Sequence, residues 1–127
     1  MIKQIALVAL GGGVGSVLRY LVSVWSSKQL HGVFPWGTFV VNITGCLLIG
    51  FLFGLITRFD LVDNELRLLL IVGVCGGYTT FSAFSVENLR LIESGNYMLF
   101  ILYVITSVLL GVIAVLGGNA LSKIIVQ

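Results

Sequence analysis

Glycine, hydroxyl and aromatic residues interrupt a dense hydrophobic segment at positions 76–85, which read Gly-Gly-Tyr-Thr-Thr-Phe-Ser-Ala-Phe-Ser. Irregular backbone at membrane depth persists only where protein buries it or where it lines a polar cavity. Because glycine adopts backbone angles that are closed to other residues, we expect the helix to break at Gly76-Gly77. A break frees carbonyl groups, which bind cations, and the N-terminus of the resumed helix attracts anions. The segment is therefore a candidate ion-binding site.

Phenyl rings and hydroxyl groups share one side of the helix expected beyond this break. Thr80, Phe84 and Glu87 fall on one helical stripe, and Phe81 and Ser85 fall on a neighbouring one. A phenyl ring is positive at its edge, so ring edges together with O–H and N–H donors stabilise a small anion without trapping it. Carboxylates would repel such an anion, and lysines would hold it too tightly. These residue types favour anion permeation over cation permeation.

Other polar residues in the hydrophobic segments each have two interpretations, because polar groups are costly at membrane depth. Asn42 either forms an interhelical hydrogen bond or donates to a polar path. Arg19 either extends to the interface or places a positive charge at the mouth of an anion path. Glu87 is either a solvated interfacial carboxylate or, beside an anion path, protonated or turned away. Hydroxyls of the last segment either continue a polar track or bond back to helix carbonyls: Tyr103, Thr106 and Ser107.

The composition defines the elements that position these residues. The chain has 127 residues, of which 58% are hydrophobic and 9% charged, and its mean hydropathy is +1.14. Soluble domains carry about 25% charged residues, so we expect an integral membrane protein that contacts the lipid bilayer. Each hydrophobic segment is long enough to cross a ~30 Å hydrocarbon core as a helix, which predicts one all-α domain over residues 1–127. The segments lie at approximately 4–25, 37–57, 67–86 and 96–121.

Small residues and charges constrain how the four helices assemble. Gly11 and Gly15, like Gly50 and Gly54, have the i, i+4 spacing of close helix packing in lipid. Four helices leave little room to enclose a broken one, so we expect a second subunit to cover it. The charge bias weakly favours a cytoplasmic N-terminus and also suits insertion in both orientations. Its members are Lys3, Arg58, Arg67 and Lys123 on one side against Lys28 and Arg90 on the other.

Several other classes of protein are disfavoured by the sequence. The net charge of +2 does not indicate a nucleic-acid partner. Cys46 and Cys75 are interpreted as small packing residues, since they form neither a disulfide framework nor a metal site. An enzyme would need a nucleophile–base or metal constellation, whereas the sole histidine, His31, lies in a loop without obvious partners. The alternative function is a small four-span proton-coupled multidrug exporter, which is disfavoured because the first segment has no carboxylate.

The chain resembles the Fluc or CrcB family of small four-span fluoride channels along its whole length. That family carries a Gly-Gly-x-[Ser/Thr]-Thr-Phe-Ser-Thr-Phe-Ser-x-Glu motif in the third span, and residues 76–87 match it except at Ala83, where threonine is usual. A glycine-rich first span that leads to Arg19-Tyr20 is also similar to the family. So is the second span, in which residues 37–45 read Gly-Thr-x-x-Val-Asn-x-x-Gly.

The resemblance implies a passive, fluoride-selective channel, not an enzyme, that lowers cytoplasmic fluoride and protects the cell from its toxicity. Such proteins are antiparallel homodimers inserted in dual topology, with two fluoride paths, in the inner or plasma membrane of a prokaryote. A structural, non-transported Na⁺ at the dimer interface would be held by the backbone carbonyls of Gly76 and Thr79. Arg19 and Glu87 would belong to the vestibule. The implied anion path comprises Asn42, Thr80, Phe81, Ser82, Phe84, Ser85, Tyr103, Thr106 and Ser107.

Overall fold

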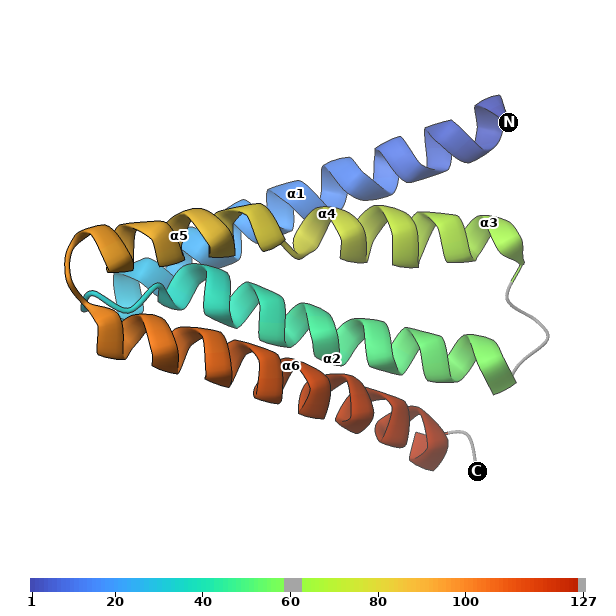
Figure 1. Ribbon diagram of the computed structural model, residues 1–127. Helices are drawn as coiled ribbons and strands as arrows, with labels where there is room; N and C mark the ends of the chain where they lie inside the picture. Colours follow the sequence, from blue (N-terminus) through green and yellow to red (C-terminus); the bar gives the residue numbers. More distant parts are fainter. Residues whose placement is uncertain (59–62, 126–127) are drawn as a thin grey trace.

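The computed structural model describes residues 1–58 and 63–125, and its secondary structure there is helical (Figure 1). Part of the connection predicted over 58–66 lies outside the described residues. The helices are α1 (Ile2–Gln29), α2 (Trp36–Arg58), α3 (Asn64–Arg67), the π-helix η1 (Leu68–Cys75), α4 (Gly76–Tyr78), α5 (Phe81–Glu93) and α6 (Tyr97–Ile125). Four runs are long and apolar enough to cross a membrane, the third being the composite 64–93. The predicted all-α, four-span architecture is confirmed.

The start of α1 and the end of α6 lie at the same end of the helical bundle, as expected for an even number of spans (Figure 1). At that end a salt bridge of 2.6 Å between Lys3 and Glu65 joins α1 to α3. At the opposite end α5 stops where Gly95 adopts a φ of 76°, a left-handed conformation that favours glycine. The turn is closed by hydrogen bonds from Gly95 N to Ile92 O and from Asn96 N to Leu91 O, after which α6 begins.

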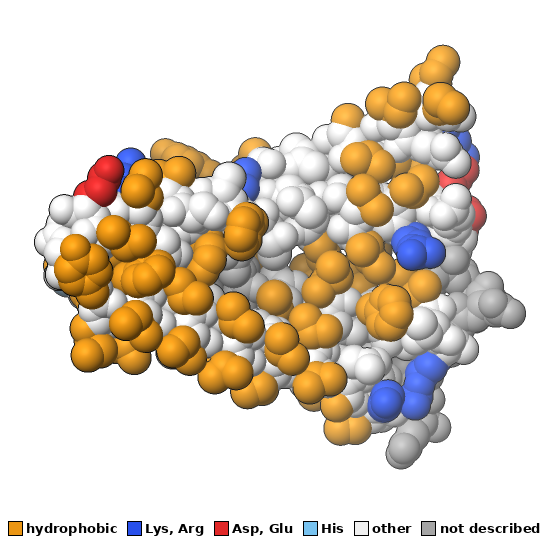
Figure 2. All heavy atoms as spheres, viewed as in Figure 1, with side chains coloured by type: hydrophobic (Ala, Val, Ile, Leu, Met, Phe, Trp, Pro, Cys, Tyr) orange, Lys and Arg blue, Asp and Glu red, His pale blue; other side chains and the backbone are white. Residues whose placement is uncertain are grey.

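The surface of a single subunit is strongly hydrophobic. Figure 2 shows hydrophobic side chains along the visible face, with charged side chains mainly toward the two ends. Only a few hydrophobic residues within the described part of the chain are buried: Val41, Cys75, Leu91 and Tyr103. Since large side chains on every span are exposed, the subunit is built to contact lipid or other protein over most of its surface.

Glycines allow the first and third spans to pack with their backbones in contact. A Cβ atom added at Gly73 would lie 2.8 Å from the Cα of Gly11, and one added at Gly77 would lie 2.5 Å from the carbonyl oxygen of Gly12. Gly15 likewise contacts the backbone of Val74. The helix-packing role predicted for the first-span glycines is confirmed, and it extends to glycines of the third span.

The second and fourth spans pack in the same manner. Gly50 approaches the backbone of Val115, and Gly118 approaches the backbone of Leu47. Further along the same pair of helices, Gly54 lies against the side chain of Ser122. The two helices therefore run in close contact along much of their length (Figure 1). This pairing holds α6 beside the face of α2 that carries Asn42.

The predicted break at Gly76-Gly77 is wrong in its position. Gly76 is helical, with φ −65° and ψ −37°, and α4 continues to Tyr78. The chain becomes extended at the next two residues, Thr79 (φ −78°, ψ 155°) and Thr80 (φ −149°, ψ 120°). The glycine at position 77 is needed for close approach to α1 and not for an unusual backbone angle, so the break requires a different cause.

Candidate functional site

The break in the third span is created by the side chain of Asn42. Its Oδ1 accepts a hydrogen bond of 2.8 Å from Thr80 N, and its Nδ2 donates one of 3.0 Å to Thr80 O. One carboxamide on α2 thus pairs with both the N–H and the C=O of Thr80 in place of helical partners. A second N–H of Nδ2 remains beyond this pair. Asn42 therefore forms the interhelical bond expected of it and still carries a donor.

The same hydrogen bonds release two backbone carbonyls at the break. Because Thr80 N donates to Asn42, the carbonyl of Gly76 lacks its usual i+4 donor. Helix α5 is then capped by Thr80 Oγ1, which accepts a hydrogen bond of 3.2 Å from Ala83 N. That cap removes the i+4 donor of the Thr79 carbonyl. Gly76 and Thr79 each present a carbonyl oxygen, the ligand type that hard cations such as Na⁺ prefer.

A cavity of about 350 Å³, termed here the phenylalanine cavity, opens beside the break. The rings of Phe81 and Phe84 lie on it with centroids 5.7 Å apart, and Phe81 is 78% exposed. From α6 it receives Ser107, whose Oγ is buried and has no hydrogen-bond partner among the described residues. The remaining lining residues are Asn42, Cys46, Ile49, Thr79, Thr80 and Val108. The lining therefore combines phenyl rings with amide and hydroxyl groups and contains no carboxylate or amine.

Glu87 accepts hydrogen bonds from two other spans. Thr38 Oγ1 on α2 donates to its Oε1 at 2.6 Å, and Tyr103 OH on α6 donates to its Oε2 at 2.7 Å. Two donors, one on each oxygen, fit the ionised carboxylate. Thr38 lies in the first turn of α2, where the helix dipole also favours a negative charge. Glu87 is half-buried, and each of its carboxylate oxygens has a hydroxyl partner on another span.

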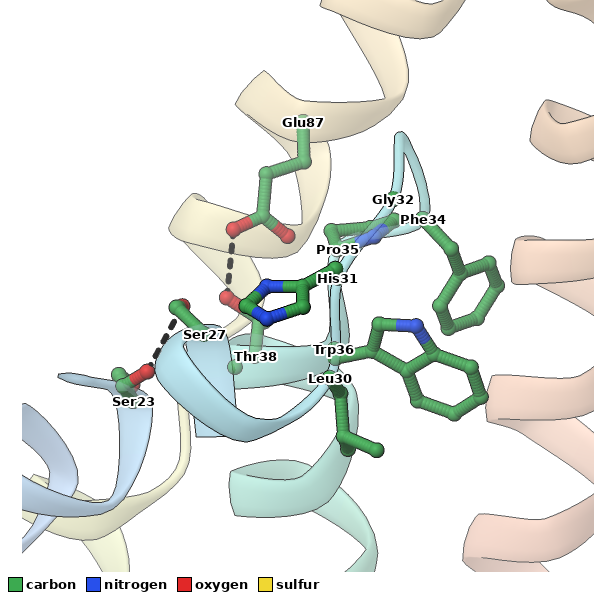
Figure 3. A pocket seen from close by; sticks show the side chains of 11 residues that line it. Ser23, Ser27, Leu30, His31, Gly32, Phe34, Pro35, Trp36, Thr38 and Glu87 are labelled. Carbon is green, nitrogen blue, oxygen red and sulfur yellow. Dashed lines mark hydrogen bonds between the residues drawn. The ribbon is translucent and has the colours of Figure 1, made fainter. Parts of the chain in front are cut away.

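Glu87 also faces a second cavity, termed here the mouth cavity, of about 340 Å³ beneath the 30–35 loop (Figure 3). Tyr103 links the two cavities: its hydroxyl bonds to Glu87, and its ring lies 4.9 Å from the ring of Phe84 in the phenylalanine cavity. The ring of Phe34, in the loop, packs edge-on against Tyr103 at 5.2 Å. A chain of aromatic and hydrogen-bonded side chains thus runs from the loop to the break.

A family model and several bacterial proteins match this chain over most of its length. The family described as "CrcB-like protein, Camphor Resistance (CrcB)" matches residues 6–119. The chain belongs to the CrcB family. A "Fluoride-specific ion channel FluC" of Phocaeicola vulgatus is 50% identical over 95% of this CrcB chain and 99% of its own length. Proteins of the same name from Flavobacterium psychrophilum and Rhizobium meliloti are 49% and 48% identical, with at least 95% of each chain covered.

The CrcB structure does not bring every predicted site residue to the phenylalanine cavity. Ser85 Oγ and Thr106 Oγ1 bond back to helix carbonyls, those of Phe81 and Leu102 respectively. Tyr103 is fully buried and bonds to Glu87 instead. Among the hydroxyls predicted on the fourth span, only Ser107 lines the cavity.

The two remaining predicted residues also lie elsewhere in this CrcB chain. Ser82 is exposed, and its Oγ lies 3.3 Å from Thr80 Oγ1. Arg19 is half-buried on α1, and within residues 1–58 and 63–125 no salt bridge involves it. Neither side chain lines the phenylalanine cavity or the mouth cavity.

Sequence reasoning missed two residues of the CrcB site, Thr38 and Cys46. Both lie on α2 with Asn42, at i−4 and i+4, and therefore on one face of that helix. Thr38 holds Glu87, and Cys46 lines the phenylalanine cavity. Their spacing of four residues from Asn42 is the signal in the sequence that could have identified both.

Proposed function

We propose that this protein is a fluoride-specific ion channel and that fluoride crosses the membrane through the phenylalanine cavity. The observation that carries the proposal is the lining of that cavity, where Phe81, Phe84, Asn42 and Ser107 converge at the helix break. The relatives that bear the name of fluoride channels support it over nearly the whole chain. Passive loss of fluoride along this path lowers its cytoplasmic concentration and protects the cell.

The lining suits a small anion that must bind briefly and leave. Phenyl ring edges, the free N–H of Asn42 and the unpartnered Oγ of Ser107 each offer weak positive potential without a full charge. A lysine or arginine at this depth would bind the anion strongly and slow its release. The chemistry of the lining therefore favours rapid passage of fluoride over tight binding.

The multidrug exporter remains the less favoured function. Proton-coupled exchange of cations needs a membrane-embedded carboxylate in the first span, and α1 contains none. The acidic residue nearest to the proposed path is Glu87, which both Thr38 and Tyr103 hold by hydrogen bonds. The lining of the phenylalanine cavity contains no carboxylate that could exchange a proton for a cationic drug.

The functional unit in this proposal is a homodimer of antiparallel subunits. Phe81 is 78% exposed although it lines the proposed path, and Gly76 is exposed beside its released carbonyl. A partner subunit that covers this face would enclose the path and shield the open backbone from lipid. The weak bias of positive charge between the two membrane sides of the helical bundle suits insertion in both orientations. Two such subunits would provide two fluoride paths.

A structural Na⁺ at the centre of this dimer fits the residues present. The released carbonyls of Gly76 and Thr79 would hold it, together with the same groups of the second subunit. The ion would supply positive charge that neutralises the carbonyl dipoles of two broken helices. It would act as a fixed support, not as transported cargo. The proposed location is the inner, or plasma, membrane of a prokaryote.

Fluoride efflux from liposomes tests the proposed function. Purified protein is reconstituted in vesicles loaded with potassium fluoride, valinomycin carries K⁺ as the counter-ion, and an electrode follows external fluoride. We expect rapid efflux that needs both protein and valinomycin, and little efflux of chloride from matched vesicles. Equal efflux of chloride and fluoride, or no fluoride efflux, would refute the proposal.

Substitution of the two phenylalanines tests the path itself. Phe81→Ile and Phe84→Ile keep an apolar side chain but remove the ring edges. We expect each to lower fluoride flux by about tenfold, which corresponds to ~1.4 kcal/mol in the barrier. Phe53→Ile is the matched control, because Phe53 is 54% exposed on α2 and does not line the cavity. Unchanged flux in both cavity variants would exclude the proposed path.

Labelling tests the dual topology. A single cysteine is placed at Ser94, in the exposed turn between α5 and α6, in a chain whose native cysteines are replaced by alanine. An impermeant thiol reagent added to intact cells should label about half of the molecules, because half expose this turn outside. Labelling of all molecules, or of none, would contradict insertion in both orientations.

A further inference from the structure

The mouth cavity holds one titratable side chain to which neither the helix packing nor the phenylalanine cavity gives a role. His31 lines this cavity from the loop, opposite Glu87 on α5. Figure 3 shows the imidazole ring of His31, from the loop, among the side chains that line this cavity together with Thr38 and Glu87. No hydrogen bond to the ring is formed within the described chain, and His31 is exposed, so its ring nitrogens are free to bind solvent or an ion.

The charge inside the mouth cavity depends on His31. Glu87 contributes a negative charge that its two hydroxyl donors stabilise. With a neutral imidazole the cavity carries a net charge of about −1, and with an imidazolium its net charge is about zero. A negative mouth repels an approaching anion, whereas a neutral one with open N–H donors does not. Protonation of one ring therefore changes what the path presents to fluoride.

We propose that the mouth cavity is an entry site for a small monovalent anion at one end of the path in each subunit, and that protonated His31 is the group that admits it. The inference rests on the proposed fluoride-channel function and assigns to His31 control over the rate of fluoride entry. Fluoride drawn into the mouth cavity passes Glu87 and Tyr103 to reach the ring of Phe84. Acidic surroundings thereby speed fluoride loss under the condition in which fluoride accumulates in cells as neutral HF.

Other charged groups near the mouth do not share this position. On α1 the cavity is lined by Ser23 and Ser27, while the charged neighbour Lys28 is exposed and does not line it. On α5 the nearest charge beyond Glu87 is Arg90, which is also exposed and outside the lining. The α2 residues that line it are uncharged, and Tyr103 of α6 faces Glu87. Within the lining, His31 and Glu87 are the titratable pair.

The test compares fluoride efflux at two pH values, set equally on both sides of the vesicle membrane. Between about pH 8 and about pH 5.5, where histidine changes charge, we expect the protein-dependent flux to rise about two- to fivefold. His31→Gln cannot be charged and His31→Arg is always charged, so in both variants the flux should be about equal at the two pH values. His31→Arg should also conduct faster than His31→Gln at pH 8. Protein-free vesicles at each pH provide the subtraction for leakage of HF.

Salt provides a readout that a structural role of the loop would not change. Raising ionic strength from about 0.1 M to about 1 M shortens the screening length from about 10 Å to about 3 Å, so the advantage of His31→Arg over His31→Gln should shrink. A wild-type pH ratio retained in His31→Gln would assign the effect to Glu87 and overturn the inference. Equal flux in the two variants at pH 8 would also overturn it. Absence of fluoride flux in the wild type would instead overturn the proposed function.

Discussion

Replacement of Gly77 by alanine separates close packing from backbone freedom as the role of this glycine. In the structure Gly77 has an ordinary helical position in α4, and its Cα faces the backbone of Gly12 on α1. A Cβ atom there would lie 2.5 Å from the Gly12 carbonyl oxygen and 2.9 Å from its Cα. Both neighbours are backbone atoms, which cannot rotate away as a side chain does, so the two helices must separate.

The size of the effect follows from two opposing terms. Overpacking of this kind typically costs ~1–3 kcal/mol, and at Gly77 the obstacle is a rigid backbone, which places it in the upper part of that range. Alanine is favoured over glycine in a helix by ~1 kcal/mol, which offsets part of the loss. We expect Gly77→Ala to lower the free energy of unfolding by ~1–2 kcal/mol. Gly12→Ala is the matched control, because a Cβ at Gly12 meets no atom within 4 Å.

Titration with a denaturing detergent measures this difference. Trp25 on α1 and Trp36 on α2 report the loss of helix packing by fluorescence, and both variants are compared with the wild type in the same micelles. Gly77→Ala should unfold at a lower detergent fraction, whereas Gly12→Ala should unfold at the same fraction or a higher one. If Gly77→Ala is as stable as the wild type, or if Gly12→Ala is equally damaging, the close-contact explanation is refuted.

Three further changes test other contacts. Asn42→Ala leaves the N–H and carbonyl of Thr80 unpaired, at ~1–3 kcal/mol each, and should lower the free energy of unfolding by ~2–6 kcal/mol in the same titration. Tyr103→Phe removes one donor to Glu87 and should cost ~1–3 kcal/mol, so an unchanged midpoint would contradict the proposed anchoring of that carboxylate. Ala83→Thr restores the usual hydroxyl outside the cavity lining, so fluoride flux should stay within about twofold, and a larger change would show that this position faces the path.

The residue types of the site could be predicted because polar residues are costly at membrane depth and stand out within a hydrophobic segment of the sequence. Phe81, Phe84, Asn42 and Ser107 are polar or aromatic residues in apolar segments, and the structure places all four on one cavity. The family and the four-helix architecture follow from motif spacing and hydrophobic length in the same way. These features are local, because each depends on residues close together in the chain.

The position of the break could not be read from the sequence because it depends on a distant partner. Glycines at 76 and 77 indicate backbone freedom when only their own segment is considered. In the structure Gly77 packs against Gly12, and the break falls where Asn42 can reach the N–H and C=O of Thr80. The hydrogen-bond partners of Glu87 could not be predicted for the same reason, since they lie on other helices. The position of the break and the partners of Glu87 depend on contacts between spans, which the sequence of a single span does not show.

The two proposed ion sites are coupled through one hydrogen bond. When Thr80 N donates to Asn42, the Gly76 carbonyl is freed toward the proposed cation site and the extended backbone opens the phenylalanine cavity. Thr80 then caps α5, and the Thr79 carbonyl is freed as well. Loss of the Asn42 side chain should therefore weaken both sites together. Ser107 lines the phenylalanine cavity but takes no part in the helix break. Loss of its hydroxyl should therefore reduce fluoride flux and leave the cation site intact.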